Sequence, residues 1–272
     1  MAESKVYKAH SIQEIQGILR ASQVAIPVSG GTTFSMNGDD KLVNIGDEIL
    51  SLNAVPELKT LHKSDRYIDF GSCVTLDEII LRGKKHVPAV LYEALNRAGN
   101  VAIRGVATIG GNLAMKNPFT ASFLPLLALD AQCEVCTERE LFWLPSSKYL
   151  TDDSLERRSV LTRIRIRDEE WTHYVYKKIK NGQYMDEIPI FLFLAKVQKN
   201  VISDAHFLFA DKHLLRAKEF DSLVVGRTLP ISKENIADIS QKAQEIFPSE
   251  LFSSVFNKKC FFNLIEKTLY DL

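Results

Sequence analysis

Two pairs of adjacent glycines constrain the fold of this chain more than any other feature. Gly30 and Gly31 occur in "AIPVSGGTTFS", and Gly110 and Gly111 occur in "VATIGGNLA". One Gly-Gly pair alone is typical of a tight turn or a bulge between strands. Here the pattern is repeated, and glycine lets backbone N–H groups approach an anion that a Cβ would block. The two segments together therefore favour two loops that hold a diphosphate from both sides.

The length, composition and net charge limit the number of domains and the kinds of macromolecule that the chain is expected to bind. At 272 residues the chain is long for one hydrophobic core and suits two moderate domains. Hydrophobic residues at 46% and charged residues at 25% are ordinary for a globular protein. The 34 basic residues balance the 34 acidic ones, so no net charge attracts nucleic acid or an anionic membrane surface. We expect no nucleic-acid partner.

The apolar segments and the cysteines bear on the cellular compartment. The start "MAESKVYKAH" lacks an apolar core of the signal-peptide type, and "FLPLLALDA" and "IPIFLFLAKV" are too short to span a bilayer. The four cysteines are too few and too scattered for a disulfide framework, which fits a reducing compartment. We expect a cytoplasmic protein with no membrane contact.

Periodicity and capping signals predict the elements of the N-terminal part. Ser11 with Glu14, and Thr75 with Glu78, form two capping boxes, which predict helix starts. Strands are expected at 6–10, 24–28, 41–46, 58–63, 66–71, 131–137, 140–145 and 159–167. Helices are expected at 11–22, 76–83, 88–99 and 118–130, the last packed behind the second glycine pair.

A change of composition at "RDEEWTH" indicates a domain boundary near Asp168. Beyond it, strands are expected at 173–179, 188–198 and 201–210, followed by helices, one of them over 232–247. We therefore predict an α+β fold. Residues 1–167 would form one domain of two mixed α/β subdomains, with glycine loops near 29–33 and 108–112. Residues 168–272 would form a smaller domain with a three-stranded antiparallel sheet and helices.

Known nucleotide-binding fingerprints do not account for the glycine pairs, because neither a P-loop nor a Rossmann G-x-G-x-x-G pattern is present. Three segments resemble instead the FAD-binding medium subunit of molybdenum hydroxylases, the xanthine dehydrogenase and carbon monoxide dehydrogenase family. They are "VSGGTT", "FGSCVTLDEI" and "AIRGVATIGGNLAMKNPF…LLALDA". The resemblance extends to "SVLTRIRI", "YKKI" and "LLRAKEFDSLVVGRTLP". Its most specific element is "TIGGN" preceded by Arg104.

The resemblance implies FAD as cofactor, with its diphosphate held by the two glycine segments. The residues it assigns there are Val28, Ser29, Gly30, Gly31, Thr32, Thr33, Thr108, Ile109, Gly110, Gly111 and Asn112. Leu161 resembles the aliphatic residue that packs on the isoalloxazine, although an ordinary leucine in the core of a strand would show the same sequence pattern. Lys177 resembles a lysine that reaches the flavin, and Lys178 is the alternative. Without the resemblance, either residue would be interpreted as a solvated lysine on the surface. No residue is assigned a catalytic role.

Two departures from the family pattern predict weaker FAD binding. Ala121 stands where many members have an acidic residue that hydrogen-bonds the polyol chain of the flavin, and Ala98 stands at an often aromatic position. We expect Ala121→Asp to tighten FAD binding. We expect Gly110→Val or Gly31→Val to remove the flavin while leaving the fold largely intact.

The remaining candidate ligands do not predict a metal site. Cys133 and Cys136 lie in an alternating, strand-like run, and no second C-x-x-C follows. The six histidines show no zinc-binding spacing such as H-E-x-x-H. We interpret the cysteines as structural and expect no metal in this chain.

The resemblance implies the flavin subunit of a multi-subunit molybdenum hydroxylase. In this hypothesis a [2Fe–2S] small subunit delivers electrons to FAD, which passes them to NAD or another acceptor, and a large subunit holds the molybdopterin. Two alternatives stay open. One is a flavin-free assembly or scaffold protein of the same fold, and the other is a self-sufficient flavin oxidase.

Overall fold

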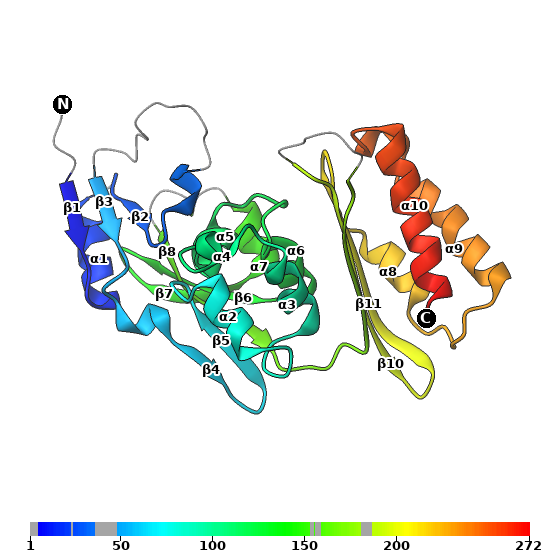
Figure 1. Ribbon diagram of the computed structural model, residues 1–272, viewed down its shortest axis with the longest axis horizontal. Helices are drawn as coiled ribbons and strands as arrows, with labels where there is room; N and C mark the ends of the chain where they lie inside the picture. The colour runs from blue at the N-terminus through cyan, green and yellow to red at the C-terminus, as the bar shows by residue number, and fades with distance from the viewer. Residues whose placement is uncertain (1–4, 23, 36–47, 153–154, 156–158, 181–186) are drawn as a thin grey trace. The chain divides into compact units, whose positions relative to one another are not determined.

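The computed structural model describes residues 5–22, 24–35, 48–152, 155, 159–180 and 187–272. The chain divides into two compact units. The first comprises Met1–Val87 and Ala94–Asp168, and the second comprises Pro88–Glu93 and Glu169–Leu272. Each unit combines helices with a β-sheet (Figure 1), which is the α+β class that the sequence predicts.

A small parallel sheet opens the first unit. Its strands are β1 (Lys5–Lys8), β2 (Ile26–Val28) and β3 (Glu48–Ser51), in the order β1-β3-β2. Helix α1 (Ile12–Ala21) connects β1 to β2. The Oγ of Ser11 accepts the Glu14 N–H at 3.1 Å, and the Glu14 carboxylate accepts the His10 N–H at 2.8 Å, so the predicted cap forms with its return bond shifted by one residue. The strand expected at 41–46 lies outside the described residues.

A five-stranded antiparallel sheet follows in the same unit. Its strands are β4 (Leu61–Lys63), β5 (Tyr67–Gly71), β6 (Gln132–Thr137), β7 (Leu141–Pro145) and β8 (Ser159–Arg167). The order is β4-β5-β8-β6-β7, so the last strand in sequence is the central one. The strand expected over 58–63 is confined to β4. Pro56 begins a 3₁₀ turn, η2 (Pro56–Lys59), because its fixed φ favours the first position of a helix.

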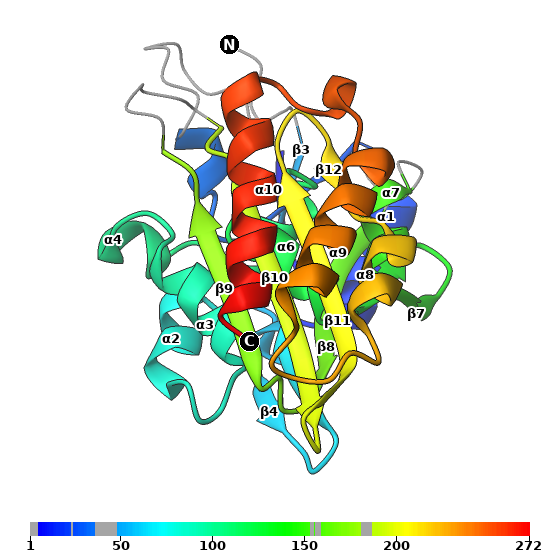
Figure 2. The same cartoon turned by 90° about the vertical axis from the view of Figure 1, so that its right-hand side faces the viewer.

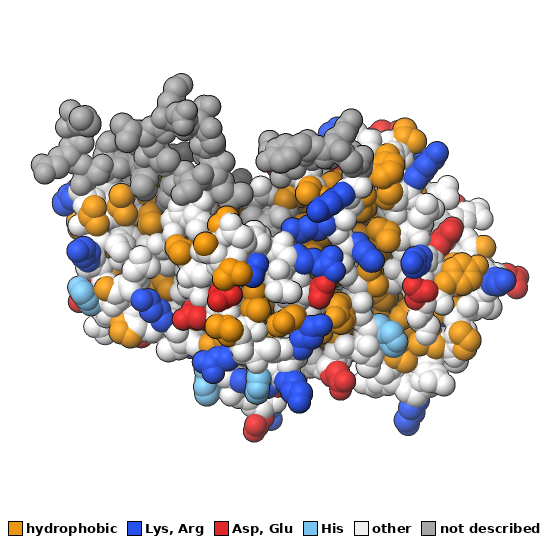
Figure 3. All heavy atoms as spheres, in the orientation of Figure 1, with side chains coloured by type: hydrophobic (Ala, Val, Ile, Leu, Met, Phe, Trp, Pro, Cys, Tyr) orange, Lys and Arg blue, Asp and Glu red, His pale blue; other side chains and the backbone are white. Residues whose placement is uncertain are grey.

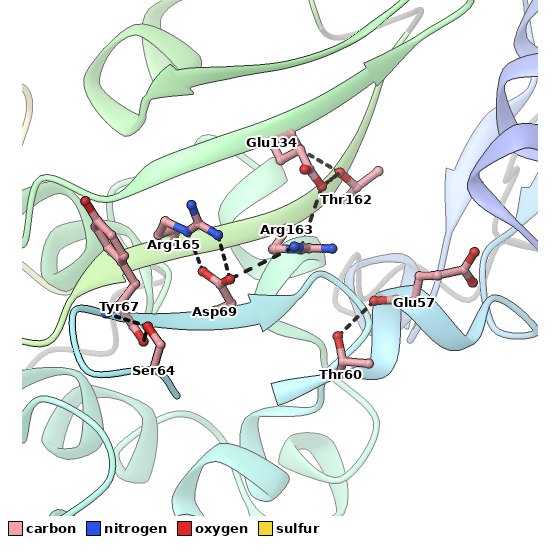
Figure 4. A network of polar contacts seen from close by, with 9 residues as sticks. All are labelled: Glu57, Thr60, Ser64, Tyr67, Asp69, Glu134, Thr162, Arg163 and Arg165. Atoms are coloured by element: carbon pink, nitrogen blue, oxygen red, sulfur yellow. Dashed lines mark hydrogen bonds and ion pairs between the residues drawn. The ribbon is translucent and has the colours of Figure 1, made fainter. Parts of the chain in front are cut away.

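An ion-pair network covers part of one face of this sheet (Figure 4). The Arg165 guanidinium donates two hydrogen bonds to the Asp69 carboxylate, at 2.7 and 2.8 Å. Arg163 lies 3.8 Å from the buried carboxylate of Glu134, which also accepts the Thr162 hydroxyl at 2.8 Å. The network joins β5, β8 and β6, so it helps to fix their register. Basic and acidic side chains both appear on the face of the molecule drawn in Figure 3.

Short helices complete the first part of the chain. They are α2 (Leu76–Arg82), α3 (Ala89–Asn96), α4 (Val101–Arg104), α5 (Ile109–Ala114), α6 (Phe123–Ala128) and α7 (Ser146–Thr151). The Thr75–Glu78 capping box of α2 is confirmed with both reciprocal bonds present. Helix α6 is shorter than the predicted 118–130. Asn117 and the three residues after it form a turn before this helix instead. Oδ1 of Asn117 accepts the Phe119 N–H at 2.9 Å, and the Asn117 carbonyl accepts the Thr120 N–H at 3.0 Å.

The second unit contains an antiparallel sheet with helices on one face (Figure 2). The strands are β9 (His173–Lys178), β10 (Ile190–Gln198), β11 (Val201–Ala210) and β12 (Leu214–Leu215), in the order β12-β11-β10-β9. The three predicted strands are present, and the two-residue β12 adds a fourth. The remaining elements are α8 (Lys218–Val224), α9 (Lys233–Ile246), η4 (Ser249–Leu251) and α10 (Val255–Tyr270).

Aromatic rings fill the core between the second unit's sheet and its helices. Phe207 of β11 contacts Phe193 of β10 and Phe220 of α8, with ring centroids 4.5 and 4.9 Å apart. Phe261 of α10 contacts Phe209 of β11 at 5.0 Å. Such ring pairs stabilise a core beyond the area that they bury.

Across the part of the chain that the structure describes, every helix is too short or too polar to cross a lipid bilayer.

Candidate functional site

A cavity of about 410 Å³ lies in the first unit, and both glycine segments contribute to its wall. This volume is typical of small-molecule and cofactor sites. Five of the residues assigned from the sequence line it: Ser29, Thr108, Gly110, Gly111 and Leu161. The fold therefore brings together residues from β2, α5 and β8 that are far apart in the chain.

The first glycine segment contributes Ser29 to the cavity wall, and Gly30 and Gly31, which follow Ser29 in the chain, are not among the lining residues. Gly31 has φ 66°, in the left-handed region that glycine adopts without strain. A Cβ on Gly30 would lie 2.0 Å from the carbonyl oxygen of Val106, so only glycine fits. Within the described part of the chain, the N–H groups of Gly30 and Gly31 donate to no other residue. Consecutive N–H groups in such a turn form a concave anion-binding surface.

The turn of the first segment is anchored at its start. The Ser29 hydroxyl donates to Oδ1 of Asn53 at 3.2 Å, and Nδ2 of Asn53 donates to the Ser29 carbonyl at 3.2 Å. Thr32 and Thr33 then begin the 3₁₀ turn η1 (Thr32–Ser35). The anchoring holds the glycine turn in one conformation before any ligand arrives.

The second glycine segment differs from the loop that the sequence predicts, because Gly110 and Gly111 form the first turn of α5. Thr108 caps this helix, and its Oγ1 accepts the Gly111 N–H at 3.2 Å. The N–H groups of Ile109 and Gly110 donate to the Val74 and Ser72 carbonyls, each at 2.9 Å. Each of these N–H groups thus has an acceptor within the protein, and the assignment of this segment to the FAD diphosphate stays a prediction.

Close packing explains the glycine at position 110. A Cβ there would lie 2.4 Å from Cβ and 2.6 Å from the carbonyl oxygen of Ser72. The expectation that Gly110→Val leaves the fold intact is therefore wrong, because backbone rather than a ligand fills the space. At Gly111 a Cβ would meet only Oγ1 of Thr108, at 3.0 Å.

Asn112 and Arg104 support the site from its periphery. Oδ1 of Asn112 accepts the Ser122 N–H at 2.8 Å and the Ser122 hydroxyl at 2.7 Å, which ties α5 to α6. Nη1 of Arg104 donates to the carbonyls of Ala98 and Gly99, each at 3.2 Å, and so closes the turn before α4. Ala121 is buried and is not among the residues that line the cavity.

Leu161 and the two candidate lysines belong to different units. Leu161 is buried on β8, opposite Val135, and lines the cavity. In β9, Lys177 pairs opposite Phe191 and Lys178 opposite Ile190, so their side chains leave the strand on opposite faces.

The structure adds Lys116, which the sequence analysis did not single out, to the cavity wall. Its Nζ donates to the Asp152 carbonyl at 2.6 Å and lies 5.8 Å from the ring centroid of Tyr149. Lys116 has φ 51°, in the left-handed region. Met115, also in the wall, accepts the Thr33 hydroxyl on its sulfur at 3.1 Å. The available sequence signal was its position directly after "GGNL".

The cysteines of β6 lie apart from the cavity wall in an apolar environment. Burial raises the pKa of the Cys133 thiol to about 12, and burial together with the nearby Glu134 carboxylate raises the pKa of Cys136 to about 11. Metals bind the thiolate, so these shifts disfavour metal binding at both positions. No group of three or more potential metal ligands gathers among the residues that the structure describes.

A cavity of this size, with Ser29 and the Gly110–Gly111 helix start in its wall, is typical of a cofactor-binding α+β protein. Residues 2–166 match the family described as "FAD binding domain in molybdopterin dehydrogenase". The chain belongs to this family. Its cofactor is FAD, as in the family of FAD-binding domains that this match defines.

The curated relatives that resemble the chain include one of similar length and one that is much longer. The glyceraldehyde dehydrogenase medium chain of Sulfolobus acidocaldarius is 23% identical over 249 residues, which cover 88% of this chain and 86% of the relative. The indole-3-acetaldehyde oxidase of Zea mays is 22% identical over 253 residues, covering 83% of this chain but only 18% of the relative. The nicotinate dehydrogenase FAD-subunit of Eubacterium barkeri is 23% identical over 165 residues, covering 59% and 55% of the two chains.

Solved structures share the fold over the whole chain. A chain of the Cu,Mo-CO dehydrogenase, in its cyanide-inactivated form, superposes with a TM-score of 0.80 at 17% identity, covering 98% of this chain and 96% of the other. A chain of quinoline 2-oxidoreductase from Pseudomonas putida 86 gives a TM-score of 0.79 at 19% identity, covering 100% and 95%.

Proposed function

We propose that this chain is the electron-transfer flavoprotein of a multi-subunit molybdenum hydroxylase. Its place would be between a [2Fe–2S] small subunit and NAD or another acceptor, with a molybdopterin-containing large subunit performing the hydroxylation. The observation that carries the proposal is the cavity of the first unit, which both glycine segments line within a domain of the FAD-binding family.

The relatives support separate partner chains. The Sulfolobus acidocaldarius relative, which matches this chain over most of both lengths, is itself named a medium chain. The Zea mays oxidase contains the matching part as 18% of a much longer polypeptide. A division in which other polypeptides supply the remaining functions agrees with both.

We assign the cofactor's contacts residue by residue. The residues of the first segment, 28–33, would hold the diphosphate through the N–H groups of Gly30 and Gly31. Residues 108–112, at the start of α5, would hold the diphosphate from its other side. Leu161 would pack against the isoalloxazine, and Lys177 or Lys178 would reach the flavin. Residues 1–167 would thus be the FAD-binding domain, and residues 168–272 the C-terminal domain. When bound, FAD supplies the redox chemistry, and the chain binds and orients it.

An absorption spectrum and a titration test the cofactor assignment. The purified chain, or the chain refolded with FAD, is expected to show flavin absorption bands and to bind one FAD per chain by fluorescence quenching. A folded, colourless protein that takes up no FAD would contradict the assignment and would support the flavin-free scaffold.

A reconstitution experiment tests the division of labour. The flavin-loaded chain should be reduced by an artificial electron donor, yet show no hydroxylation of purine or aldehyde substrates with a dye acceptor. Addition of the small and large subunits should produce turnover. Turnover by this chain alone would contradict the proposal and would support a self-sufficient oxidase.

A further inference from the structure

A break in the pairing of β8 places Leu161 in the cavity wall. Glu134 of β6 pairs with Arg163 of β8. The next residue of β6, Val135, pairs with Leu161 rather than Thr162, which makes Thr162 the extra residue of a β-bulge. Paired residues share a face of the sheet, and side chains alternate along a strand. Regular pairing would therefore place Leu161 on the face of Arg163, whereas the bulge places it on the opposite face, where it lines the cavity.

The side chains of Thr162 and Glu134 hold this bulge. The Thr162 hydroxyl donates to Oε2 and to the carbonyl oxygen of Glu134, at 2.8 and 3.1 Å, and both residues are buried (Figure 4). In regular pairing Thr162 would lie opposite Val135, and its hydroxyl would leave the strand on the face away from the Glu134 carboxylate. A buried carboxylate needs hydrogen-bond partners. The hydrogen bond therefore favours the bulge over regular pairing.

The backbone of the bulge is connected to two further residues of the cavity wall. The Thr162 carbonyl accepts the Ser72 N–H at 2.9 Å, and the Ser72 carbonyl accepts the Gly110 N–H at 2.9 Å. Ser72, Gly110 and Leu161 all line the cavity. Bulges are over-represented beside functional sites, where they redirect a side chain. The bulge at Thr162 thus bears on wall residues from three separate segments of the chain.

We propose that Thr162 and Glu134 are positioning residues of the cofactor site, because their hydrogen bond holds the bulge that directs Leu161 against the isoalloxazine of FAD. Neither residue is among those that line the cavity, so both act through Leu161. The inference rests on the proposed function of this cavity and on the contact proposed for Leu161. A hydrogen bond that only stabilised the sheet would leave FAD affinity unchanged, so affinity and stability distinguish the two roles.

A double-mutant cycle tests the inference. FAD is titrated by flavin fluorescence into the wild-type chain, Thr162→Val, Leu161→Ala and the double variant, and a melting curve of each shows that it is folded. Valine keeps the shape of threonine and removes the hydroxyl, so Thr162→Val should weaken FAD binding about tenfold, as expected for loss of a hydrogen bond to a charged group. In the Leu161→Ala background the same replacement should change FAD affinity less than about twofold, because the residue through which it acts is already truncated.

Two further variants serve as controls. Thr162→Ser keeps the hydroxyl, so its FAD affinity should stay within about twofold of the wild type. Thr60→Val removes a hydroxyl that donates to the Glu57 carbonyl at 3.1 Å, in the same unit but away from the cavity wall, and should bind FAD like the wild type. Visible circular dichroism of the bound flavin reports on the surroundings of the isoalloxazine. At saturating FAD it should change in Thr162→Val and remain unchanged in Thr60→Val.

The outcomes separate the inference from the proposed function. Equal FAD affinity in the wild type and Thr162→Val would overturn the inference but leave the proposed function intact. Equal losses from Thr162→Val in the two backgrounds would also overturn it, because they would show an effect that does not pass through Leu161. If Leu161→Ala does not fold, the comparison of Thr162→Val with Thr162→Ser decides, and equal FAD affinity in those two variants overturns the inference. A wild-type chain that binds no FAD would overturn the proposed function itself.

Discussion

At the scale of single residues, Asp221 makes stability depend on pH. Its side chain is buried in the second unit, where Oδ1 accepts the Phe207 N–H at 2.9 Å, and burial raises its pKa from 3.8 to about 6. The folded chain therefore binds this proton more tightly than the unfolded chain does. The contribution is fully present below about pH 4 and is lost as the pH rises through about 6. The loss amounts to at most about 3 kcal/mol of unfolding free energy.

Replacement of Asp221 by asparagine should remove this dependence and keep the Phe207 hydrogen bond. Urea unfolding between pH 4 and 8 measures it, with Trp171 fluorescence reporting on the second unit in a Trp143→Phe background. Asp271→Asn, at an exposed position of the same unit, should keep the wild-type slope. An unchanged slope in Asp221→Asn would show that another group causes it.

The four cysteines should differ in reactivity. Cys73, Cys133 and Cys136 are buried, whereas Cys260 on α10 is partly exposed. The thiolate is the reactive form, so burial and the raised pKa values of Cys133 and Cys136 should suppress reaction. In the native protein at pH 8, a maleimide followed by peptide mass mapping should label Cys260 first and the other three only after unfolding. Native labelling of Cys133 as fast as Cys260 would contradict its buried position.

The residue types predicted the location of the site better than the contacts that shape it. The Gly-Gly pattern located the cavity wall, because glycine is required wherever backbone approaches closely. It did not show what approaches: Ser72 lies against Gly110 and Val106 against Gly30, and both neighbours are distant in sequence. Lys116 could not be identified for a similar reason, since its position depends on the left-handed end of α5 and on Tyr149.

At the scale of elements, α5 allows a sharp comparison between neighbouring glycines. Gly110→Ala should lower the unfolding free energy of the first unit by at least about 2 kcal/mol, because its Cβ meets the Ser72 backbone. Gly111→Ala should change stability by no more than about 1 kcal/mol, since alanine favours the helix and the new Cβ meets only the Thr108 hydroxyl. Urea unfolding measured by Trp143 fluorescence, in a Trp171→Phe background, gives both values.

The same two variants distinguish packing from ligand binding. Gly111 lines the cavity, so Gly111→Ala should reduce FAD affinity in a stable protein. Equal stability losses in the two variants would contradict the packing role assigned to Gly110. Unchanged FAD affinity in Gly111→Ala would count against a cofactor contact at that position.

Elements governed by local chemistry were predictable, and those governed by distant contacts were not. The helix starts at Ser11 and Thr75 are confirmed because a cap involves only neighbouring residues. The loop expected around Gly110 is a helix instead, because Val74 and Ser72 accept its first N–H groups. The pairing order of the five-stranded sheet likewise depends on contacts that no local pattern encodes.

At the scale of the whole molecule, FAD should protect one unit more than the other. A ligand that binds only the folded form stabilises it by about 2.7 kcal/mol at a concentration 100 times its Kd. The two units have separate cores, so amide hydrogen exchange should slow around Gly30, Gly31 and α5, and remain unchanged in α9 and α10. Slower exchange in β9 would support a contact from Lys177 or Lys178. Equal slowing throughout both units would contradict a site in the first unit.

The position of β8 has a consequence for biosynthesis. The ribosome completes β4, β5, β6 and β7 before it reaches residues 159–167, yet β8 lies between β5 and β6 in the sheet. The hairpins β4-β5 and β6-β7 on the nascent chain therefore keep unpaired strand edges until β8 emerges. Unpaired edges of this kind promote aggregation. Leu161 belongs to that same strand, so cofactor loading is expected to follow translation of β8 and to depend on chaperones that shield the waiting edges.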